Sequence, residues 1–495
     1  MKLHIIGSGI LVLVILAACA GPDANIAVTA TLPDPEVRVV DSPVETGEMP
    51  AELPDTLEVE AGQNPGPSMA FGLESHQANF LDHDDLVGAP GLTLMRHNGL
   101  LWYEIEPIEG ERDWAAAADL ERVLEQASAS GLSTILIVRG TPQWAQRFPG
   151  SYCGPILPEK LDQFADFLGE AVRRYSQPPY NVRYWELGNE PDVDPLLVRS
   201  NSVFGCWGNY LDAYYGGGYY ADMLKVVYPV IKSADPKARV LLGGLLLDCD
   251  PSQPPQGKDC SAGNFLEGVL SNGGGDYFDI LSFHGYTPYF GPASGYPYEL
   301  YMDKHNPSWE HLGGVVNGKI NYIRQLFEKY QVEKPIYLTE AALMCAEYNP
   351  TDCDPPGAAF YDTQAEYAIR LYVGNWANGI EGTIWYQFEG PGWRYSGLLD
   401  EEQNPKPVYE ALAYLANSLS QSVYNGEVNQ YENLLGYEFI SPGKHTWVLW
   451  SPEQIDISIP VPSDLSAAYD KYGSEVTPSG DQLVVNSPLY LEFTP

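Results

Sequence analysis

Short apolar segments alternate with helical patterns along most of this 495-residue chain. Eight apolar segments have the length of a buried strand, and they span residues 69–73, 92–96, 134–139, 182–187, 240–246, 280–284, 336–339 and 383–388. Amphipathic segments lie between them, at residues 115–130, 159–175, 219–233, 319–330 and 363–378. This repeat predicts a (β/α)8 barrel. A doubly wound sheet is the alternative, but no glycine-rich phosphate loop follows the first segment.

The pattern changes near residue 420, where short alternating strands replace the strand–helix repeat. These predicted strands span residues 436–440, 446–450, 455–460, 482–485 and 489–493. Strands separated by Pro, Gly and Ser turns predict a small antiparallel, sandwich-like domain over residues 420–495. The predicted fold class is therefore α/β, a TIM barrel over residues 68–419 with a small C-terminal β-domain.

The N-terminus combines a positive charge, an apolar run and a small-residue box. Lys2 precedes a mostly apolar stretch that ends in Leu16-Ala17-Ala18-Cys19. This stretch is too short for a stable transmembrane helix, and residues 1–18 resemble a bacterial lipoprotein signal peptide. The resemblance implies cleavage before Cys19, lipidation of its thiol and a lipid-anchored place in the cell envelope or at the cell surface. An ordinary secretory signal is the alternative. Residues 19–67, rich in Pro and acidic side chains, are predicted to form an extended tether.

The charge balance excludes several classes of partner. The chain has 27 Lys and Arg against 66 Asp and Glu, which gives a net charge of −39. Binding nucleic acid or an anionic membrane surface needs the opposite sign, so no nucleic acid is expected and membrane contact is expected through the lipid anchor alone. The 34 Tyr and 11 Trp fit an exported protein that handles neutral polar ligands, since aromatic faces can stack on sugar rings.

Six cysteines follow Cys19, and an even number in an exported chain favours disulfides. None of them has the close C-x-x-C spacing of a zinc site or a redox dithiol. Six cysteines allow about 15 pairings. Proximity along the chain favours Cys249–Cys260 and Cys345–Cys353, which leaves Cys153–Cys206.

Two carboxylates stand where predicted barrel strands end. Glu190 lies in Gly188-Asn189-Glu190-Pro191-Asp192 after the fourth predicted strand, and Glu340 follows the seventh. The ends of barrel strands meet at one opening, so we expect both side chains to face it. Cleavage of a glycosidic bond needs such a pair, because one carboxyl protonates the departing oxygen while the other attacks the anomeric carbon or activates water. Glu186, four residues before Glu190, is expected to be buried and paired instead.

The chain resembles clan A glycoside hydrolases, most of all glycoside hydrolase family 39 and its relatives. The motifs that carry the resemblance are Gly91-Leu-Thr-Leu-Met-Arg96 with Trp102, Glu106-Pro107, Gly110 and Trp114; Pro142 with Trp144-Ala145; Gly188-Asn189-Glu190-Pro191-Asp192; Phe278-Asp279 through His284; Lys334-Pro335 through Glu340; and Gly397-Leu-Leu-Asp400 with Pro405-Lys-Pro407. It implies a retaining double displacement on β-linked glycosides or oligosaccharides, with Glu190 as acid/base and Glu340 as nucleophile. A carbohydrate substrate is expected, and no cofactor.

Further residues are expected around this pair. Arg96, at the end of the second predicted strand, is the natural cation to keep the nucleophile ionised, and Tyr286 is a phenolic donor to it. The resemblance implies that Asn189 hydrogen-bonds the sugar 2-hydroxyl and that Trp385 is a platform for the sugar ring. Trp144 is a weaker candidate for substrate contact.

His284 ends the sixth predicted strand, and no second His or Cys lies at ligand spacing from it. It is therefore expected to make a substrate or supporting hydrogen bond, and no metal site is predicted. Gly188 departs from the family, where many relatives carry a bulky residue, and this difference is expected to enlarge the pocket. The long loops at residues 192–218 and 288–309 are expected to build the substrate subsites.

Two other functions would use the same features. A surface lipoprotein on a retired barrel could capture glycans without cleaving them, although such a protein has no need to keep both carboxylates. A transglycosylase would share every catalytic residue and differ only in its acceptor site.

Overall fold

The computed structural model describes residues 70–76, 91–199, 202, 204–345, 353 and 355–493. The predicted signal peptide, the lipidation site at Cys19 and the predicted tether lie outside the described residues. None of the helices in the described part is long and apolar enough to cross a membrane.

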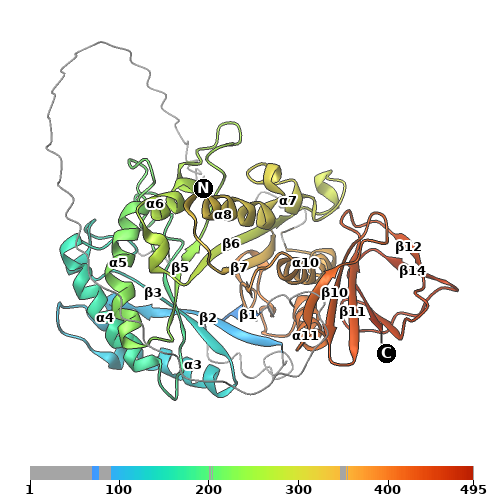
Figure 1. The fold of residues 1–495 in the computed structure, drawn as a ribbon, viewed down its shortest axis with the longest axis horizontal. Helices are drawn as coiled ribbons and strands as arrows, with labels where there is room; N and C mark the ends of the chain where they lie inside the picture. Colours follow the sequence, from blue (N-terminus) through green and yellow to red (C-terminus); the bar gives the residue numbers. More distant parts are fainter. Residues whose placement is uncertain are drawn as a thin grey trace, which may run out of the picture. The chain divides into compact units, whose positions relative to one another are not determined.

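Eight parallel strands close into a barrel in the order β1 to β8, with β8 paired to β1 (Figure 1). They are β1 Ala70–Glu74, β2 Leu92–Leu101, β3 Ser133–Arg139, β4 Tyr184–Asn189, β5 Arg239–Leu245, β6 Ile280–Tyr289, β7 Ile336–Cys345 and β8 Gly382–Trp385. The predicted TIM barrel is confirmed. Each predicted apolar segment overlaps one strand, but β2, β6 and β7 run five or six residues further than their apolar segments.

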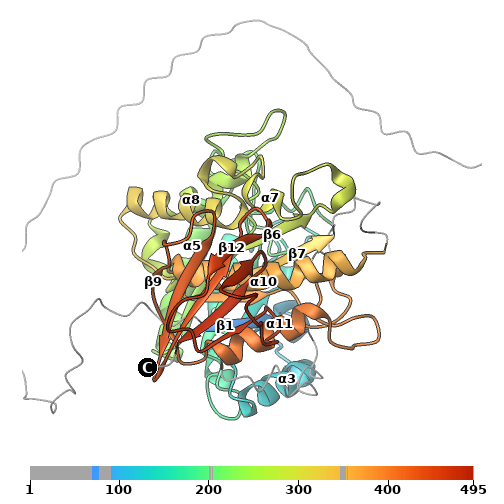
Figure 2. The ribbon, with the colours of Figure 1, turned by 90° about the vertical axis from the view of Figure 1, so that its right-hand side faces the viewer.

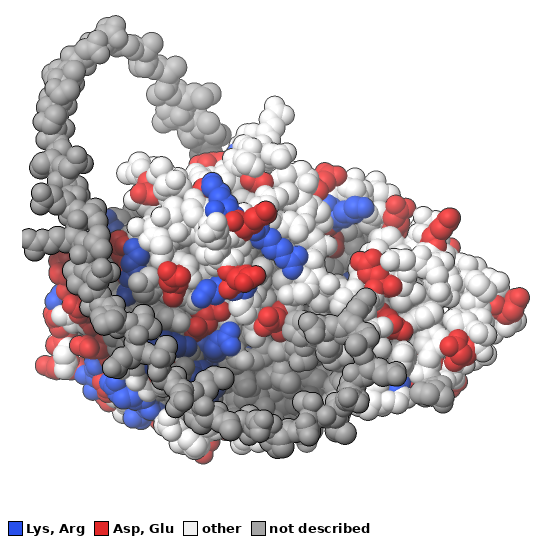
Figure 3. All heavy atoms as spheres, in the orientation of Figure 1, with Lys and Arg blue, Asp and Glu red and all other residues white. Residues whose placement is uncertain are grey.

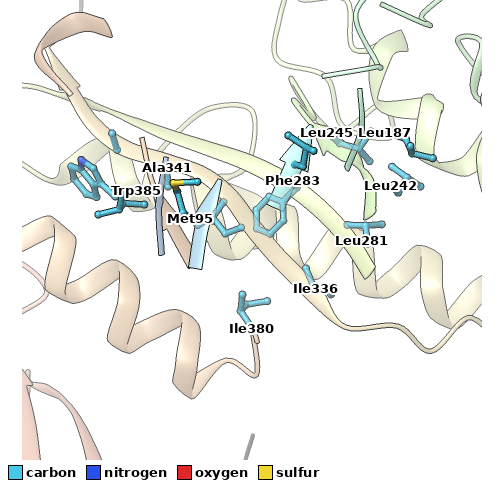
Figure 4. Packing of buried hydrophobic residues seen from close by; sticks show 14 of the residues in the cluster. Met95, Leu187, Leu242, Leu245, Leu281, Phe283, Ile336, Ala341, Ile380 and Trp385 are labelled. Atoms are coloured by element: carbon cyan, nitrogen blue, oxygen red, sulfur yellow. The ribbon is translucent and has the colours of Figure 1, made fainter. Parts of the chain in front are cut away.

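Helices surround the barrel and bury their apolar faces against it. They are α2 Trp102–Ile105, α3 Ala118–Ala129, α4 Leu161–Tyr175, α5 Gly217–Ala234, α6 Asn264–Ser271, α7 Tyr301–Lys304, α8 Val315–Tyr330, α10 Ala358–Ala377 and α11 Pro407–Ser418. Figure 4 shows the matching outward faces of the strands, where Met95, Phe283 and Trp385 belong to the layer between barrel and helices.

The barrel interior is filled in layers, because alternate residues of a strand point to the same side. One layer is apolar and contains Leu94, Ile135, Leu241, Ile280, Tyr337 and Ile384. Several of the next interior positions toward the carboxyl ends of the strands are polar, among them Arg96 on β2 and Glu186 on β4. The interior therefore turns from apolar to ionic toward the carboxyl ends of the strands, which we call the mouth.

The C-terminal strands form an antiparallel sheet in the order β13-β15-β11-β10-β9 and a two-stranded sheet of β12 and β14. Their bounds are β9 Val423–Glu427, β10 Leu435–Ser441, β11 Lys444–Trp450, β12 Ile457–Pro460, β13 Ala467–Tyr469, β14 Gln482–Val485 and β15 Leu489–Phe493. Figure 2 shows this β-domain beside α10 and α11. Phe439 of β10 packs against Trp376 of α10 with ring centroids 4.7 Å apart, so the β-domain shares the hydrophobic core of the barrel.

Three disulfides join the predicted pairs, Cys153–Cys206, Cys249–Cys260 and Cys345–Cys353. The predicted pairing is confirmed. Cys153–Cys206 links the loop after β3 to the loop after β4, and these loops leave neighbouring strands. On the face in Figure 3, Asp and Glu side chains are spread over the surface with Lys and Arg between them.

Candidate active site

The mouth brings together the two carboxylates that the sequence singles out. Glu190 directly follows β4 and Glu340 lies within β7, and each residue is only 5% exposed. One carboxylate oxygen of each, together with a ring nitrogen of His284, lie within 4.8 Å of one another. The two side chains therefore face a common point, although β4 and β7 are not neighbours in the barrel.

Glu340 is held by donors at both oxygens. Its Oε1 accepts a hydrogen bond from Nη1 of Arg96, and its Oε2 accepts one from the hydroxyl of Tyr286. Nδ1 of His284 lies 3.4 Å from the same Oε2. A carboxylate surrounded by a cation and a hydroxyl donor is stabilised in its ionised form.

Glu190 is fixed by its backbone and by one side-chain contact. Its N–H donates to the carbonyl of Gly244 on β5 at 2.9 Å, and its Oε1 lies 2.9 Å from Nδ1 of His284. The backbone of Glu190 has a φ of +51°, in the left-handed region that few non-glycine residues adopt. Gly188 has a φ of +89°, which explains glycine at this position by backbone conformation and not only by the wider pocket expected from the sequence.

The environments of the two carboxyls separate their pKa values. Burial raises the pKa of Glu190 well above its usual range, and the charges of Glu340 and Asp192 raise it further. Burial also raises the pKa of Glu340, to about 7, but Arg96 and the Tyr286 hydroxyl oppose this rise. Glu340 therefore ionises first and Glu190 keeps its proton, which is the division of roles that acid/base and nucleophile require.

Arg96 is the centre of the ionic layer and is fully buried. Its guanidinium pairs with Glu186 at 2.6 Å, with Glu74 at 2.5 Å and with Glu340. Burial alone would disfavour the charge, but the carboxylates of Glu186, Glu74 and Glu340 raise the pKa of Arg96 well above its usual value. The expected role of Glu186 as a buried, paired residue is confirmed. Glu74 was not singled out in the sequence, although it lies one residue beyond the first apolar segment.

The hydrogen bonds of Arg96 also orient its neighbours. Its Nη2 donates to Oδ1 of Asn189 at 2.8 Å, so the amide nitrogen of Asn189 is left for another acceptor. The same Nη2 lies 3.4 Å from Nε2 of His284 and can only donate, which assigns the proton of the neutral imidazole to Nδ1. That Nδ1–H then donates to Oε1 of Glu190, and the acid proton of Glu190 falls on Oε2. Burial keeps the pKa of His284 well below its usual value, so the ring is neutral.

Two features around His284 escape a sequence reading. A Cβ at Gly244 would lie 2.1 Å from Nε2 of His284, so glycine is needed there to admit the ring. Lys319 reaches in from α8 and donates from Nζ to the carbonyls of His284 at 2.8 Å and Leu246 at 2.7 Å. Burial lowers the pKa of Lys319 to about 8. No short sequence pattern predicts either contact, because each contact joins residues from different strands or helices.

The expected platform role of Trp385 needs correction. Trp385 is fully buried, and its indole N–H donates to the carbonyl of Ser396 at 2.8 Å, so it offers no free face to a sugar. Side chains alternate along β8, and Trp385 points to the helices (Figure 4) while the next residue points to the mouth. That residue is Tyr386, whose ring centroid lies 5.9 Å from that of Tyr286.

Two further aromatic residues complete the picture. Trp393, which the sequence analysis did not select, is 46% exposed and packs edge-on against Tyr286 at 5.2 Å. It is therefore an accessible aromatic side chain beside the Glu340 environment. Trp144 packs edge-on against Trp102 at 5.1 Å and donates from its indole to the carbonyl of Glu106 at 3.0 Å. No contact among the described residues joins Trp144 to either carboxylate.

The spacing of Glu190, His284 and Glu340 would also suit a metal ion. The same atoms already serve other bonds, however. Both oxygens of Glu340 accept from Arg96 and Tyr286, and the His284 nitrogen that faces Glu190 carries a proton. A metal ion would have to displace these donors, and the fixed charge of Arg96 would repel it.

Comparison with known proteins places the fold. No model of a known protein family matches the chain, and no curated protein matches it significantly. Among solved structures, it is similar to a family 39 glycoside hydrolase from Bacteroides cellulosilyticus WH2, with 21% identity over 87% of this chain and 81% of that one and a TM-score of 0.61. A GH30 endoxylanase from Clostridium papyrosolvens C71 has 12% identity, coverage of 88% and 98%, and a TM-score of 0.56.

A family 51 alpha-L-arabinofuranosidase from Bifidobacterium longum is similar to the same degree, with 13% identity, coverage of 88% and 98%, and a TM-score of 0.54. At these identities the likeness establishes the architecture. The chain has a TIM-barrel fold and structurally resembles solved glycoside hydrolases of families 39, 30 and 51.

Proposed function

We propose that this protein is a retaining glycoside hydrolase that cleaves β-linked glycosides or oligosaccharides, with Glu190 as acid/base and Glu340 as nucleophile. The observation that carries the proposal is the spacing of the two carboxylates, whose nearest oxygens lie within 4.8 Å. Retaining enzymes have carboxyl groups about 5–5.5 Å apart, whereas inverting enzymes leave about 6.5–9.5 Å for a water molecule. The spacing therefore favours direct attack on the sugar.

In the first step, a carboxylate oxygen of Glu340 forms a bond to the anomeric carbon as the glycosidic bond breaks. The proton on Oε2 of Glu190 moves to the departing oxygen, so the leaving group departs neutral. In the second step, Glu190, now ionised, takes a proton from water as the water oxygen attacks the same carbon. The bond to Glu340 breaks, Glu190 regains its proton, and two inversions give net retention.

The surrounding residues support these steps. Arg96 and Tyr286 hold Glu340 ionised and aimed, and His284 holds Oε1 of Glu190 so that Oε2 carries the proton. The free amide nitrogen of Asn189 is placed to donate to the sugar 2-hydroxyl, a contact that strengthens in the transition state. Lys319 fixes the backbone of His284 and acts as a positioning residue.

Product stereochemistry tests the proposal. Purified protein is incubated with a panel of β-linked aryl glycosides and oligosaccharides, and the first product is followed by NMR before mutarotation. We expect the β-anomer to form first. An α-anomer as first product would exclude double displacement, and binding without turnover across the panel would favour a glycan-capturing protein. Transfer of the sugar to added acceptors at the expense of hydrolysis would favour a transglycosylase.

The pH dependence of kcat/KM is expected to be bell-shaped. Activity needs Glu340 ionised and Glu190 protonated, so it rises as pH increases through the Glu340 pKa of about 7 and falls as pH passes the higher pKa of Glu190. The measurement is kcat/KM from pH 4 to 10 on an aryl glycoside. In Glu190→Ala the alkaline limb should disappear, and its persistence there would assign that limb to another group.

We also propose that the protein works outside the cytoplasm, attached through a lipid at Cys19. Three disulfides suit an oxidising compartment. The signal-like residues 1–18 support the same location. Mass spectrometry of the mature N-terminus in a bacterial host tests this proposal, because lipidation adds a defined mass to Cys19.

A further inference from the structure

A second arginine, Arg139, ends β3 at the mouth. Ile135 of the same strand belongs to the apolar interior layer, and Leu136 and Val138 pack outward against the helices. Residues at alternate positions share a face, so Ile137 and Arg139 point into the barrel. Arg139 thus lies between the strand of Arg96 and the strand that leads to Glu190.

Arg139 differs from Arg96 in having no carboxylate partner among the described residues. Its Nε donates to Oδ1 of Asn98 at 2.5 Å, which is its one hydrogen bond to the residues that the structure describes. It forms no ion pair there, and its two terminal nitrogens are not enclosed by protein. A guanidinium has five N–H donors, so those on the two terminal nitrogens remain available to a ligand.

A partly buried guanidinium without an ion-pair partner destabilises the folded protein, unless a bound ligand pairs with it. Burial lowers the pKa of Arg139, while the charges of Glu104 and Glu74 act on it only from beyond contact distance. Several carboxylates lie in the mouth, yet none in the described part of the chain pairs with this guanidinium. The guanidinium of Arg139 is partly desolvated, and its terminal N–H groups have no ion-pair partner among the described residues. Such a group can bind two oxygens of an anion through parallel hydrogen bonds.

Aromatic side chains stand beside this guanidinium. Tyr103 contributes to its electrostatic surroundings and packs edge-on against Tyr152 with ring centroids 5.2 Å apart. Tyr152 is 38% exposed, and the following Cys153 is tied to Cys206 by a disulfide. Tyr152 thus offers an accessible ring on an anchored loop, in contact with the Tyr103 ring whose charge acts on Arg139, and such a ring suits a sugar that carries an anionic group.

We propose that Arg139 binds an anionic substituent of the substrate, either the carboxylate of a uronic acid or a sulfate ester. The two groups share planar or near-planar pairs of charged oxygens that a guanidinium can hold with two hydrogen bonds. This inference rests on the proposed glycosidase function, because it assigns the substrate class of that same site. It makes Arg139 a specificity residue, distinct from the pair that breaks the bond.

The test compares matched 4-nitrophenyl β-glycosides that differ only at C6, in the glucose and galactose series: the neutral hexoside, the uronide and the 6-sulfate. Wild-type protein should prefer one charged substrate. In Arg139→Gln, kcat/KM for that substrate should fall by about tenfold to a hundredfold, as expected for loss of charged hydrogen bonds, with the neutral hexoside unchanged within about twofold. Which charged substrate responds identifies carboxylate or sulfate.

Matched variants secure the interpretation. Arg122→Gln removes the same charge from an exposed position on α3 and should change none of the three values. Arg139→Lys keeps the charge but not the planar fork and should recover part of the preference. Equal losses on neutral and charged substrates in Arg139→Gln, or no loss on either charged one, would overturn the inference.

A binding measurement separates this inference from the proposed function. If wild-type protein hydrolyses none of the glycosides, the same compounds serve as ligands in calorimetry. Tighter binding of a charged glycoside than of its neutral partner, lost in Arg139→Gln, would then uphold the anion site while the hydrolase proposal fails. Equal affinity for charged and neutral glycosides in wild-type protein would reject the anion site itself.

Discussion

Replacing Glu340 by alanine is expected to lower kcat/KM by roughly 10⁴- to 10⁶-fold, the scale of losing a covalent nucleophile. The loss should appear with activated aryl leaving groups as well, because no glycosyl-enzyme bond can form. Steady-state kinetics on 4-nitrophenyl glycosides measures it. Glu190→Ala should lose about 10²- to 10⁴-fold on substrates with poor leaving groups and much less on activated ones, because activated groups need no proton.

Azide distinguishes the two roles. In Glu340→Ala, azide can occupy the space of the lost carboxylate and attack the anomeric carbon directly, which gives a glycosyl azide of inverted configuration. In Glu190→Ala, azide attacks the intermediate on Glu340 from the other face, which gives the retained azide. NMR of the two products assigns each carboxylate, and exchanged configurations would reverse the assignment. Glu125→Gln, at an exposed position on α3, is the matched control and should keep wild-type activity.

Arg96→Met is expected to destabilise the protein by about 3–5 kcal/mol, the cost of leaving buried charges without their partner. Glu74, Glu186 and Glu340 all lose their cation in this variant. Urea unfolding followed by tryptophan fluorescence measures the effect. Burial holds the pKa of Glu340 and of Glu74 at about 7 even beside Arg96, and loss of this cation raises both further. The variant therefore keeps protons that the wild-type protein has lost above pH 7, so the destabilisation should grow as pH rises through about 7 and be smaller below it.

The matched control is Arg122→Met, which breaks an ion pair with Asp119 whose side chains are 64% and 92% exposed. Exposed pairs contribute about 0–1 kcal/mol, so this change should leave the unfolding midpoint almost unmoved. A loss below about 1 kcal/mol in Arg96→Met would show that the interior carboxyls are neutral and that Arg96 does not hold them. Activity of Arg96→Met should fall too, since Glu340 loses its charged donor.

Much of the barrel could be predicted because its strands are buried on both faces and appear as continuous apolar runs. The apolar runs do not predict the carboxyl ends of the strands that extend into the mouth. In β6 the chain continues beyond His284 through Tyr286, whose hydroxyl donates to Glu340. In β7 the polar residues Thr339 and Glu340 interrupt an apolar run that resumes at Ala341 in the hydrophobic core. In the β-domain, β9 and β13 escaped prediction because they are short and lack a clear apolar alternation.

The candidate site was predictable where a residue ends or closely follows an apolar run, and where the family resemblance names a residue. Glu190, Glu340, Arg96 and His284 stand at such ends, and the structure brings them together. Glu74 and Arg139 stand at equivalent ends but belong to no motif that the sequence analysis used. The prediction for Trp385 was wrong by one residue. Neighbouring residues of a strand face opposite sides, so Trp385 faces the helices and Tyr386 faces the mouth. Lys319 lies in the middle of α8, and only the folded structure brings it to His284.

The disulfide between Cys153 and Cys206 has a consequence for maturation. Gly205, next to Cys206, donates its N–H to the carbonyl of Asn189, and Asn189 precedes Glu190. Oxidation of one cysteine pair thus secures the chain that frames the Glu190 segment. Under reducing conditions the Cys153–Cys206 disulfide would not form, and the segment around Gly205 would lose this covalent link. The backbone around Glu190 would then reach its final geometry only in an oxidising compartment. If the proposed activity and location hold, export would complete the site and so activate the protein.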